Sequence, residues 1–250
     1  MMDKRVQQAV YNNAVWCDTV CRAHGWPGEF YEDIWVQWHG SLPYYPNAVT
    51  LTDECNLTTQ RQAIQHLADA RLPEGCGAKD SFCVLDLAPL GFEPLFEATW
   101  LYRPATLPPP IEPIQGVQWR RVQEATELRV WERAWRGAPG EETGEEPARL
   151  FLPTLLTYEQ VVFLAAYQAQ EIVAGAILNR TDSVVGLSNL FVPDKEQVSW
   201  WSSCVAAASE LFPGLPLVGY EHGQELAYAQ QCGFVAIGPL RIWIKVGEAL

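Results

Sequence analysis

The clearest pattern of apolar and polar positions lies near the C-terminus, in residues 217–245. Residues 217–220 form a short apolar run after two prolines and a glycine, as expected for a buried strand. Three small or apolar residues then recur at helical spacing: Leu226, Ala229 and Cys232. Gly233 can end that helix, because glycine adopts the left-handed conformation at low cost. Residues 241–245 alternate like a half-buried strand, so the pattern predicts strand, helix, turn and strand.

The preceding part of the chain shows the same two periodicities. Three strands are predicted at residues 161–167, 172–179 and 184–192. A helix follows, whose apolar positions are Trp201, Val205, Ala208 and Phe212.

This element order, together with Gly233-Phe234 after a helix, resembles the GNAT (GCN5-related N-acetyltransferase) superfamily. The resemblance covers residues 118–245 and rests on the order of elements and one short motif. It implies an α/β acyl-CoA N-acyltransferase fold, with a mixed, mostly antiparallel sheet flanked by helices and a closing hairpin. It also implies acetyl-CoA as co-substrate and direct transfer of the acetyl group to an amine.

The first half of the chain repeats part of this pattern. Leu90-Gly91-Phe92, followed by Trp100, parallels Cys232-Gly233-Phe234, followed by Trp243, about 142 positions later. Strands are predicted at residues 34–39, 48–51, 81–87 and 97–103. Too few residues precede Gly91 for a full helix. We therefore interpret the chain as a tandem GNAT-like fold with a degenerate first copy.

A proline-rich stretch supplies the best domain boundary. Residues 104–113 contain three consecutive prolines and read as a semi-rigid extended linker. The predicted organisation is a degenerate domain at 1–104, a linker at 105–115 and an acetyltransferase domain at 116–250. An acidic stretch at 137–147 is expected to be a solvated loop more readily than a cover over the acceptor site.

Composition narrows the partners. The formal net charge of −13 argues against nucleic acid and mildly favours a cationic acceptor. The lack of an apolar run near the ~20 residues that span a bilayer argues against a membrane. Seven scattered cysteines and no apolar N-terminal leader favour a cytoplasmic protein. We expect a small-molecule or peptide amine acceptor, and either a monomer or a homodimer.

The resemblance places the co-substrate beside the strand that ends near Val192. It implies that Leu190, Phe191 and Val192 pair with pantetheine, and that the N–H groups of Gln197, Val198 and Ser199 hold the pyrophosphate. GNAT enzymes usually carry glycines here, whereas residues 191–201 contain none. Asp194 and Glu196 add negative charge against the single Lys195. An ordinary strand-to-helix turn is therefore the competing interpretation.

The candidate catalytic residues follow the next strand. The resemblance implies a tyrosine acid four residues before Gly233, where this chain has Ala229, so the adjacent Tyr228 is the candidate. Glu221 is the candidate general base, with His222 and Glu225 nearby. Alternatively, Glu221 caps the following helix or pairs with Arg241.

Two further interpretations stay open. Cys17, Cys21 and His24 share a helix face, but buried cysteines are common and no second ligand pair lies nearby, so no metal site is predicted. A non-catalytic GNAT-like protein that binds a small ligand or a protein partner competes with the enzyme.

Overall fold

The computed structural model describes residues 3–53, 57–70, 72, 74–108, 114–137 and 148–247. The predicted linker lies partly outside these residues, and the acidic stretch lies almost wholly outside them. The chain forms two compact units, Met1–Trp100 with Ala236–Leu250, and Leu101–Val235. The units therefore divide the chain differently from the predicted boundaries, because the C-terminal segment groups with the first half of the sequence. None of the helices within the described ranges is long and apolar enough to cross a membrane.

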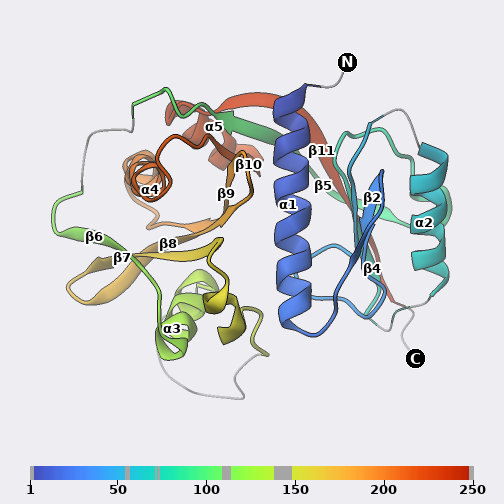
Figure 1. The fold of residues 1–250 in the computed structure, drawn as a ribbon, viewed down its shortest axis with the longest axis horizontal. Coiled ribbons are helices and arrows are strands. Elements are labelled where there is room, and N and C mark those ends of the chain that lie inside the picture. Colours follow the sequence, from blue (N-terminus) through green and yellow to red (C-terminus); the bar gives the residue numbers. More distant parts are fainter. Residues whose placement is uncertain are drawn as a thin grey trace. The chain divides into compact units, whose positions relative to one another are not determined.

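The first unit is built on a mixed sheet with strand order β1-β2-β3-β4-β11-β5 (Figure 1). Its elements are α1 (Lys4–Ala23), β1 (Glu29–Phe30), β2 (Ile34–Val36), β3 (Ala48–Thr50), α2 (Leu57–Asp69), β4 (Cys76–Asp80), the 3-10 helix η2 (Ala88–Leu90), β5 (Glu93–Arg103) and β11 (Val235–Lys245). β3 and β4 are parallel, with α2 between them in sequence, and β11 pairs antiparallel with β4. Ile64, Leu67 and Trp243 lie buried in the core of this unit.

Two predicted elements of this unit are wrong. Residues 81–87 do not form a strand; the strand is β4, which ends at Asp80. The Asp80 carboxylate accepts the backbone N–H groups of Val84 and Leu85, at 3.2 and 2.9 Å, and so holds a turn there. The expected closing hairpin is also absent from the described chain. β11 runs from Val235 to Lys245 without a break, so the chain continues through Gly238 as one strand.

The second unit carries the predicted meander, with strand order β10-β9-β8-β7-β6. Its elements are β6 (Val117–Arg121), α3 (Ala125–Trp135), the 3-10 helix η3 (Pro153–Thr157), β7 (Val161–Gln168), β8 (Glu171–Arg180), β9 (Val185–Phe191), α4 (Gln197–Leu211), β10 (Leu217–Glu221) and α5 (Gly223–Gln231). Of these elements, β7, β8, β9, α4, β10 and α5 match the predicted strands and helices to within a few residues. Periodicity was therefore sufficient for these six elements.

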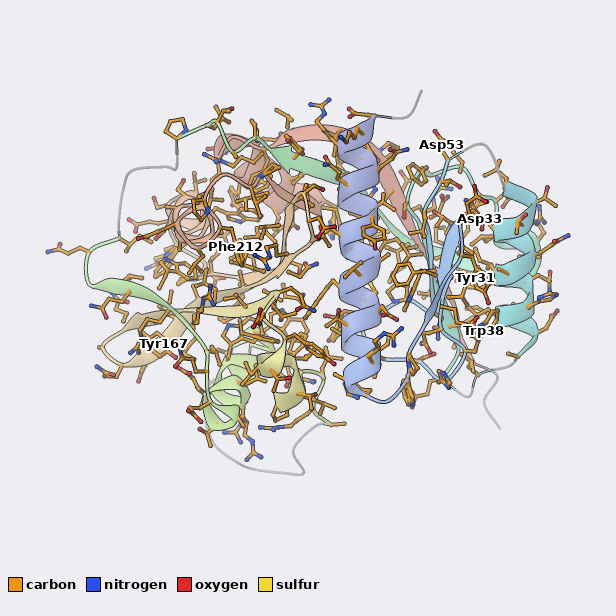
Figure 2. The ribbon with its side chains drawn as sticks, in the orientation of Figure 1. Tyr31, Asp33, Trp38, Asp53, Tyr167 and Phe212 are labelled. Carbon is orange, nitrogen blue, oxygen red and sulfur yellow. The ribbon has the colours of Figure 1, made fainter. Side chains whose placement is uncertain are left out.

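Helices cover both faces of the second unit's sheet (Figure 1). On one face, α4 and α5 bury Val205, Ala208 and Ala229 against β7, β8 and β9. Phe212, which Figure 2 labels, joins the same core just beyond the end of α4. On the other face, the Trp131 ring of α3 packs edge-on against Phe151 and Phe163, with centroids 5.7 and 5.2 Å away.

The two halves of the sequence share local geometry at their Gly-Phe motifs. Gly91 and Gly233 have φ values of 82° and 88°. The N–H of Phe92 donates to Leu87, and the N–H of Phe234 donates to Ala229, which is the same cap five residues back in each case. A three-residue 3-10 helix precedes the first cap, whereas α5 precedes the second. These features agree with a duplication, which stays a prediction.

Candidate functional site

The two parallel strands β9 and β10 part after a short contact. Leu217 lies opposite Val185 and Val218 lies opposite Gly186, and the pairing then ends. At the point of parting, a Cβ built on Gly219 would lie 2.7 Å from the carbonyl oxygen of Leu187. Only a glycine at this position permits the close approach. Beyond it, the rest of β9 runs on without β10 beside it.

A bulge bends β9 just where β10 leaves it. Gly175 of β8 lies opposite Phe191, but Ile177 lies opposite Ser188, so two residues of β9 oppose one residue of β8. Asn189, one of those two, has a positive φ of 51°. Asparagine tolerates this left-handed conformation better than most residues. The bulge therefore changes the direction of the backbone in the segment that contains Leu190, Phe191 and Val192.

The side chains of that segment are half-buried. Leu190 packs against the core under α4 and α5. The Phe191 ring lies 5.3 Å from the Trp131 ring on the opposite face. Trp200 and Trp201, which follow in α4, are both buried. Bulky residues at these two positions therefore fill the core.

The N-terminus of α4 follows β9 directly and has no side-chain cap. Glu196 is the N-cap residue, with φ 57° and ψ 35°, and its side chain accepts no hydrogen bond from the helix. The N–H groups of Gln197, Val198 and Ser199 belong to the first turn, where a helix has no intrahelical acceptors to offer. The partial positive charge at this end favours an anion. The exposed carboxylates of Asp194 and Glu196 act against that preference.

Glu221 ends β10 on the far side of the parting strands. Part of its side chain remains exposed, yet protein surrounds the carboxyl closely enough that burial raises its pKa to about 8, with a further contribution from Glu225. A carboxyl with such a pKa exchanges its proton near neutral pH, as a general base must. The two structural alternatives for Glu221 are wrong. His222 is the N-cap residue of α5, and Arg241 binds Glu97, with Nε 3.0 Å from Oε1.

Comparison with known proteins finds similar structures but no similar sequences. No protein-family model matches the chain, and no curated protein matches it in sequence. A GCN5-related N-acetyltransferase from Kribbella flavida has a TM-score of 0.66, with 15% identity and 97% of each chain covered. The chain has the GNAT fold. A putative GNAT acetyltransferase from Novosphingobium aromaticivorans (TM-score 0.55, 12% identity, 92% of this chain and 95% of that one) agrees. So does a GCN5-related N-acetyltransferase from Sphaerobacter thermophilus (TM-score 0.53, 12% identity, 100% and 99% covered).

Within this GNAT fold, the other catalytic candidate is less well placed. Tyr228 is half-buried and packs against the core that contains Ala229. Within the described residues its hydroxyl has no hydrogen-bond partner. Glu221 lies at the end of β10, at the same end of the parallel pair as the residues of β9. The structure shows no contact between Tyr228 and Glu221.

Sequence reasoning missed two features of this GNAT-fold site. The bulge at Asn189 left one signal, which is an asparagine inside an apolar strand. Ser188, its neighbour, has a buried hydroxyl oxygen with no partner in the described structure. No sequence pattern distinguishes such a hydroxyl from an ordinary strand serine.

The predicted absence of a metal site concerns a different part of the chain. Cys17 and Cys21 are buried in the core face of α1. The described residues contain no group of three or more histidines, cysteines or acids that could hold a metal ion.

Proposed function

We propose that this protein is an acetyl-CoA-dependent N-acetyltransferase whose co-substrate lies where β9 and β10 part. The observation that carries the proposal is the parting of a parallel strand pair directly before an uncapped helix N-terminus. The first feature offers free strand backbone to a peptide-like chain, and the second offers N–H groups to an anion.

The backbone of this site suits acetyl-CoA, but the acidic side chains beside it do not. Its pantetheine arm carries two amides, which pair with the backbone of Leu190 and Val192 as an added strand would. Its pyrophosphate meets the N–H groups of Gln197, Val198 and Ser199 in the first turn of α4. Asp194 and Glu196 repel the same phosphates. Residues 191–201 contain no glycine that would let the backbone approach the phosphates closely. We therefore expect binding that is weaker than in a glycine-rich loop.

Side chains of the protein would then accept and donate the protons that the transfer requires. Bound acetyl-CoA supplies an acetyl group activated as a thioester. Glu221 accepts a proton from the ammonium form of the acceptor, directly or through one water, which frees the nitrogen lone pair for attack. As the nitrogen bonds to the acetyl carbon, the carbon–sulfur bond breaks and the thiolate of CoA leaves. Tyr228 is the candidate that would protonate this thiolate.

The acceptor is a cationic amine. Glu221 and Glu225 are close enough to interact, since Glu225 raises the pKa of Glu221. An ammonium group between them would relieve the repulsion between the two carboxylates. The net charge of −13 would draw such a cation toward the protein.

The test is an acetyl-transfer assay with a panel of primary amines, following release of the free thiol. We expect activity that rises with pH through an apparent pKa near 8. Replacement of Glu221 by Gln should lower the rate by roughly 10²- to 10⁴-fold. Replacement of Glu225 by Gln should move the profile to lower pH. Absence of turnover with every amine, or a profile that neither variant changes, would refute the enzymatic proposal.

A non-catalytic protein with the same fold is the second candidate. The acids at positions 194 and 196, and the missing glycines, favour it, because they weaken the anion site without disturbing the fold. It predicts a ligand that binds with no acyl transfer to any amine.

A further inference from the structure

One buried hydroxyl of the second unit lacks a hydrogen bond. The hydroxyl oxygen of Ser188 is buried, and it has no partner within the described structure. A buried polar group without a hydrogen bond destabilises a fold, so such groups are uncommon and often mark a place that a ligand completes. Ser188 belongs to β9, which is the strand that the proposed function assigns to acetyl-CoA.

The side chain of Ser188 lies on the face of the sheet that α3 covers. Phe163 of β7 lies opposite Ile177 of β8, and Ile177 lies opposite Ser188. Residues that lie directly opposite each other in antiparallel strands share a face of the sheet. The Phe163 ring packs against Trp131 of α3, with the ring centroids 5.2 Å apart. Phe163 and Ile177 are buried and apolar, so neither side chain can accept a hydrogen bond from Ser188.

The backbone of β9 loses its regular pairing on both sides near Ser188. The last pair of β9 with β10 is Gly186 with Val218, two residues before Ser188. Toward β8, the bulge at Asn189 follows directly. A bulge leaves its extra residue outside the ladder. A ligand can therefore approach Ser188 from the side on which β10 has parted.

The proposed direction of acetyl-CoA brings its thioester to this residue. The pyrophosphate lies at residues 197–199 and the pantetheine at Val192 and then Leu190, so the molecule runs backward along β9. Ser188 comes next, two residues or about 7 Å further back along the strand. The end of pantetheine beyond its second amide carries the acetyl group in that direction. A serine hydroxyl rotates about its Cα–Cβ bond, so it can turn toward the acetyl carbonyl.

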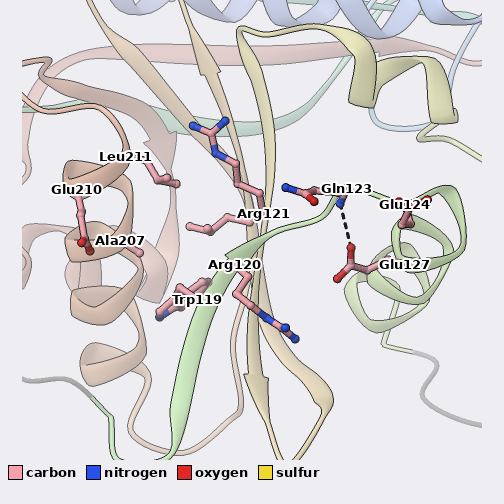
Figure 3. A pocket seen from close by; sticks show the side chains of 10 residues that line it. Trp119, Arg120, Arg121, Gln123, Glu124, Glu127, Ala207, Glu210 and Leu211 are labelled. Carbon is pink, nitrogen blue, oxygen red and sulfur yellow. Dashed lines mark hydrogen bonds between the residues drawn. The ribbon is translucent and has the colours of Figure 1, made fainter.

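The cavity of about 610 Å³ along β6 is a separate place (Figure 3). β7 and β8 lie between β6 and β9, so this cavity does not account for the hydroxyl of Ser188. Charges of both signs line the cavity and favour no single class of ligand: Arg120, Arg121, Glu124, Glu127 and Glu210.

We propose that the Ser188 hydroxyl donates a hydrogen bond to the carbonyl oxygen of the acetyl group in bound acetyl-CoA. This inference rests on the proposed function, which supplies the ligand and its direction. The carbonyl oxygen gains negative charge as the amine attacks, so a donor held there stabilises the transition state. The hydroxyl keeps its own proton. The nitrogen–carbon bond forms, the carbon–sulfur bond breaks, and its electron pair leaves with the sulfur.

Calorimetry with three ligands tests this hydrogen bond without requiring turnover. The ligands are acetyl-CoA, free CoA and S-ethyl-CoA, in which a methylene group replaces the carbonyl group. We expect the parent protein to bind acetyl-CoA roughly five- to tenfold more tightly than S-ethyl-CoA. Ser188→Ala should remove this difference and leave the affinities for free CoA and S-ethyl-CoA unchanged.

Ser209→Ala, in α4, is the matched control. The Ser209 hydroxyl already donates to the carbonyl of Val205, at 2.8 Å. Its loss should leave all three affinities unchanged. Urea unfolding gives a second measurement, in which Ser188→Ala should be at least as stable as the parent because it loses no internal hydrogen bond. A marked loss of stability in Ser188→Ala would show that the hydroxyl has a partner within the protein, and would overturn the proposal.

The results separate this hydrogen bond from the proposed function. If Ser188→Ala binds acetyl-CoA as tightly as the parent does, the hydrogen bond is absent although the co-substrate binds. Equal affinities of the parent for acetyl-CoA and S-ethyl-CoA, or equal weakening of all three ligands in Ser188→Ala, would likewise overturn the hydrogen bond alone. No binding of any of the three ligands by the parent would overturn the proposed function as well.

Discussion

Two residues near the proposed site hold a left-handed backbone, and they differ in how well they suit it. Asn189 (φ 51°) is a residue type that adopts this conformation readily. Glutamate adopts this conformation less readily, and the side chain of Glu196 (φ 57°) accepts no hydrogen bond from a helix N–H that would offset the strain. A glycine at Glu196 would adopt the same backbone without strain and without charge. The strain at Glu196 thus falls at the N-cap of α4, where glycine would avoid it.

We therefore predict that Glu196→Gly raises the free energy of unfolding by about 1 kcal/mol. Asp194→Gly is the matched control. It removes the same charge, but Asp194 does not have a positive φ, so added chain entropy should lower stability slightly. Urea unfolding of both variants checks this. Equal changes in stability would show that charge, and not backbone strain, governs the loop.

The carboxyl of Glu221 makes stability depend on pH. Its folded-state pKa of about 8 exceeds the value of 4.5 expected in the unfolded chain. The folded state therefore binds the proton more tightly, and its stability falls as pH rises from about 4.5 to about 8. Glu221→Gln should be more stable than the parent at pH 9, by on the order of 1 kcal/mol or more, and similar at pH 4.5.

Urea unfolding at a series of pH values measures this difference. Glu225→Gln should reduce the dependence without abolishing it, because burial is the larger cause of the raised pKa. A parent and a Glu221→Gln variant with parallel stability curves would contradict the raised pKa.

At the level of elements, the packing of β10 against β9 depends on one glycine. The close approach of β10 to Leu187 leaves no room for a Cβ at Gly219, which would lie 2.7 Å from a backbone oxygen. Gly219→Ala should cost about 1–3 kcal/mol and force the strands apart.

Gly238→Ala, in β11, is the control for Gly219→Ala. The nearest atom to its added Cβ is the Val6 Cγ2, at an ordinary 3.5 Å. Thermal unfolding compares the two variants. A Gly219→Ala protein as stable as Gly238→Ala would mean that the strands approach less closely than described.

Periodicity was sufficient to predict β7, β8, β9, α4 and α5, because each has one face against the core of its own unit. It failed at residues 81–87, where apolar residues around the Asp80 turn imitate a strand. The closing hairpin, which the resemblance implied, is replaced by the single strand β11. At the site, the resemblance to the GNAT superfamily pointed to residues 190–192, to residues 197–199 and to Glu221. The bulge, the strain at Glu196 and the raised pKa depend on contacts between strands that periodicity does not describe.

At the scale of the whole molecule, the order of the chain and its compact units do not coincide. β11 comes from the end of the sequence, but five of its residues pair with β4 of the first unit. Its Trp243 is only 4% exposed and lies in that unit's core. Conversely, the last residues of β5, from Leu101 on, belong to the second unit. There the Arg103 Nε donates to the carbonyl of Cys232 at 2.9 Å.

Deletion of Ala236–Leu250 should therefore unfold the first unit, although the deleted residues are distant from it in sequence. Hydrogen exchange should show loss of protection in β4 and retention in β7 and β8. Trp243→Ala is a milder variant that should cost roughly 3–5 kcal/mol in the same unit. Loss of protection in β7 and β8, with β4 unaffected, would instead support a domain at residues 116–250.

Calorimetry with acetyl-CoA and free CoA tests most directly whether acetyl-CoA binds where β9 and β10 part. We expect weak binding of both ligands by the parent protein. We expect tighter binding when Asp194→Gly and Glu196→Gly are combined, because the double variant removes two repelling charges and lets the backbone before α4 approach the phosphates. Gly219→Ala should weaken binding in either background. No heat of binding in the parent or in the double variant, or an affinity that the double variant leaves unchanged, would show that acetyl-CoA does not bind there.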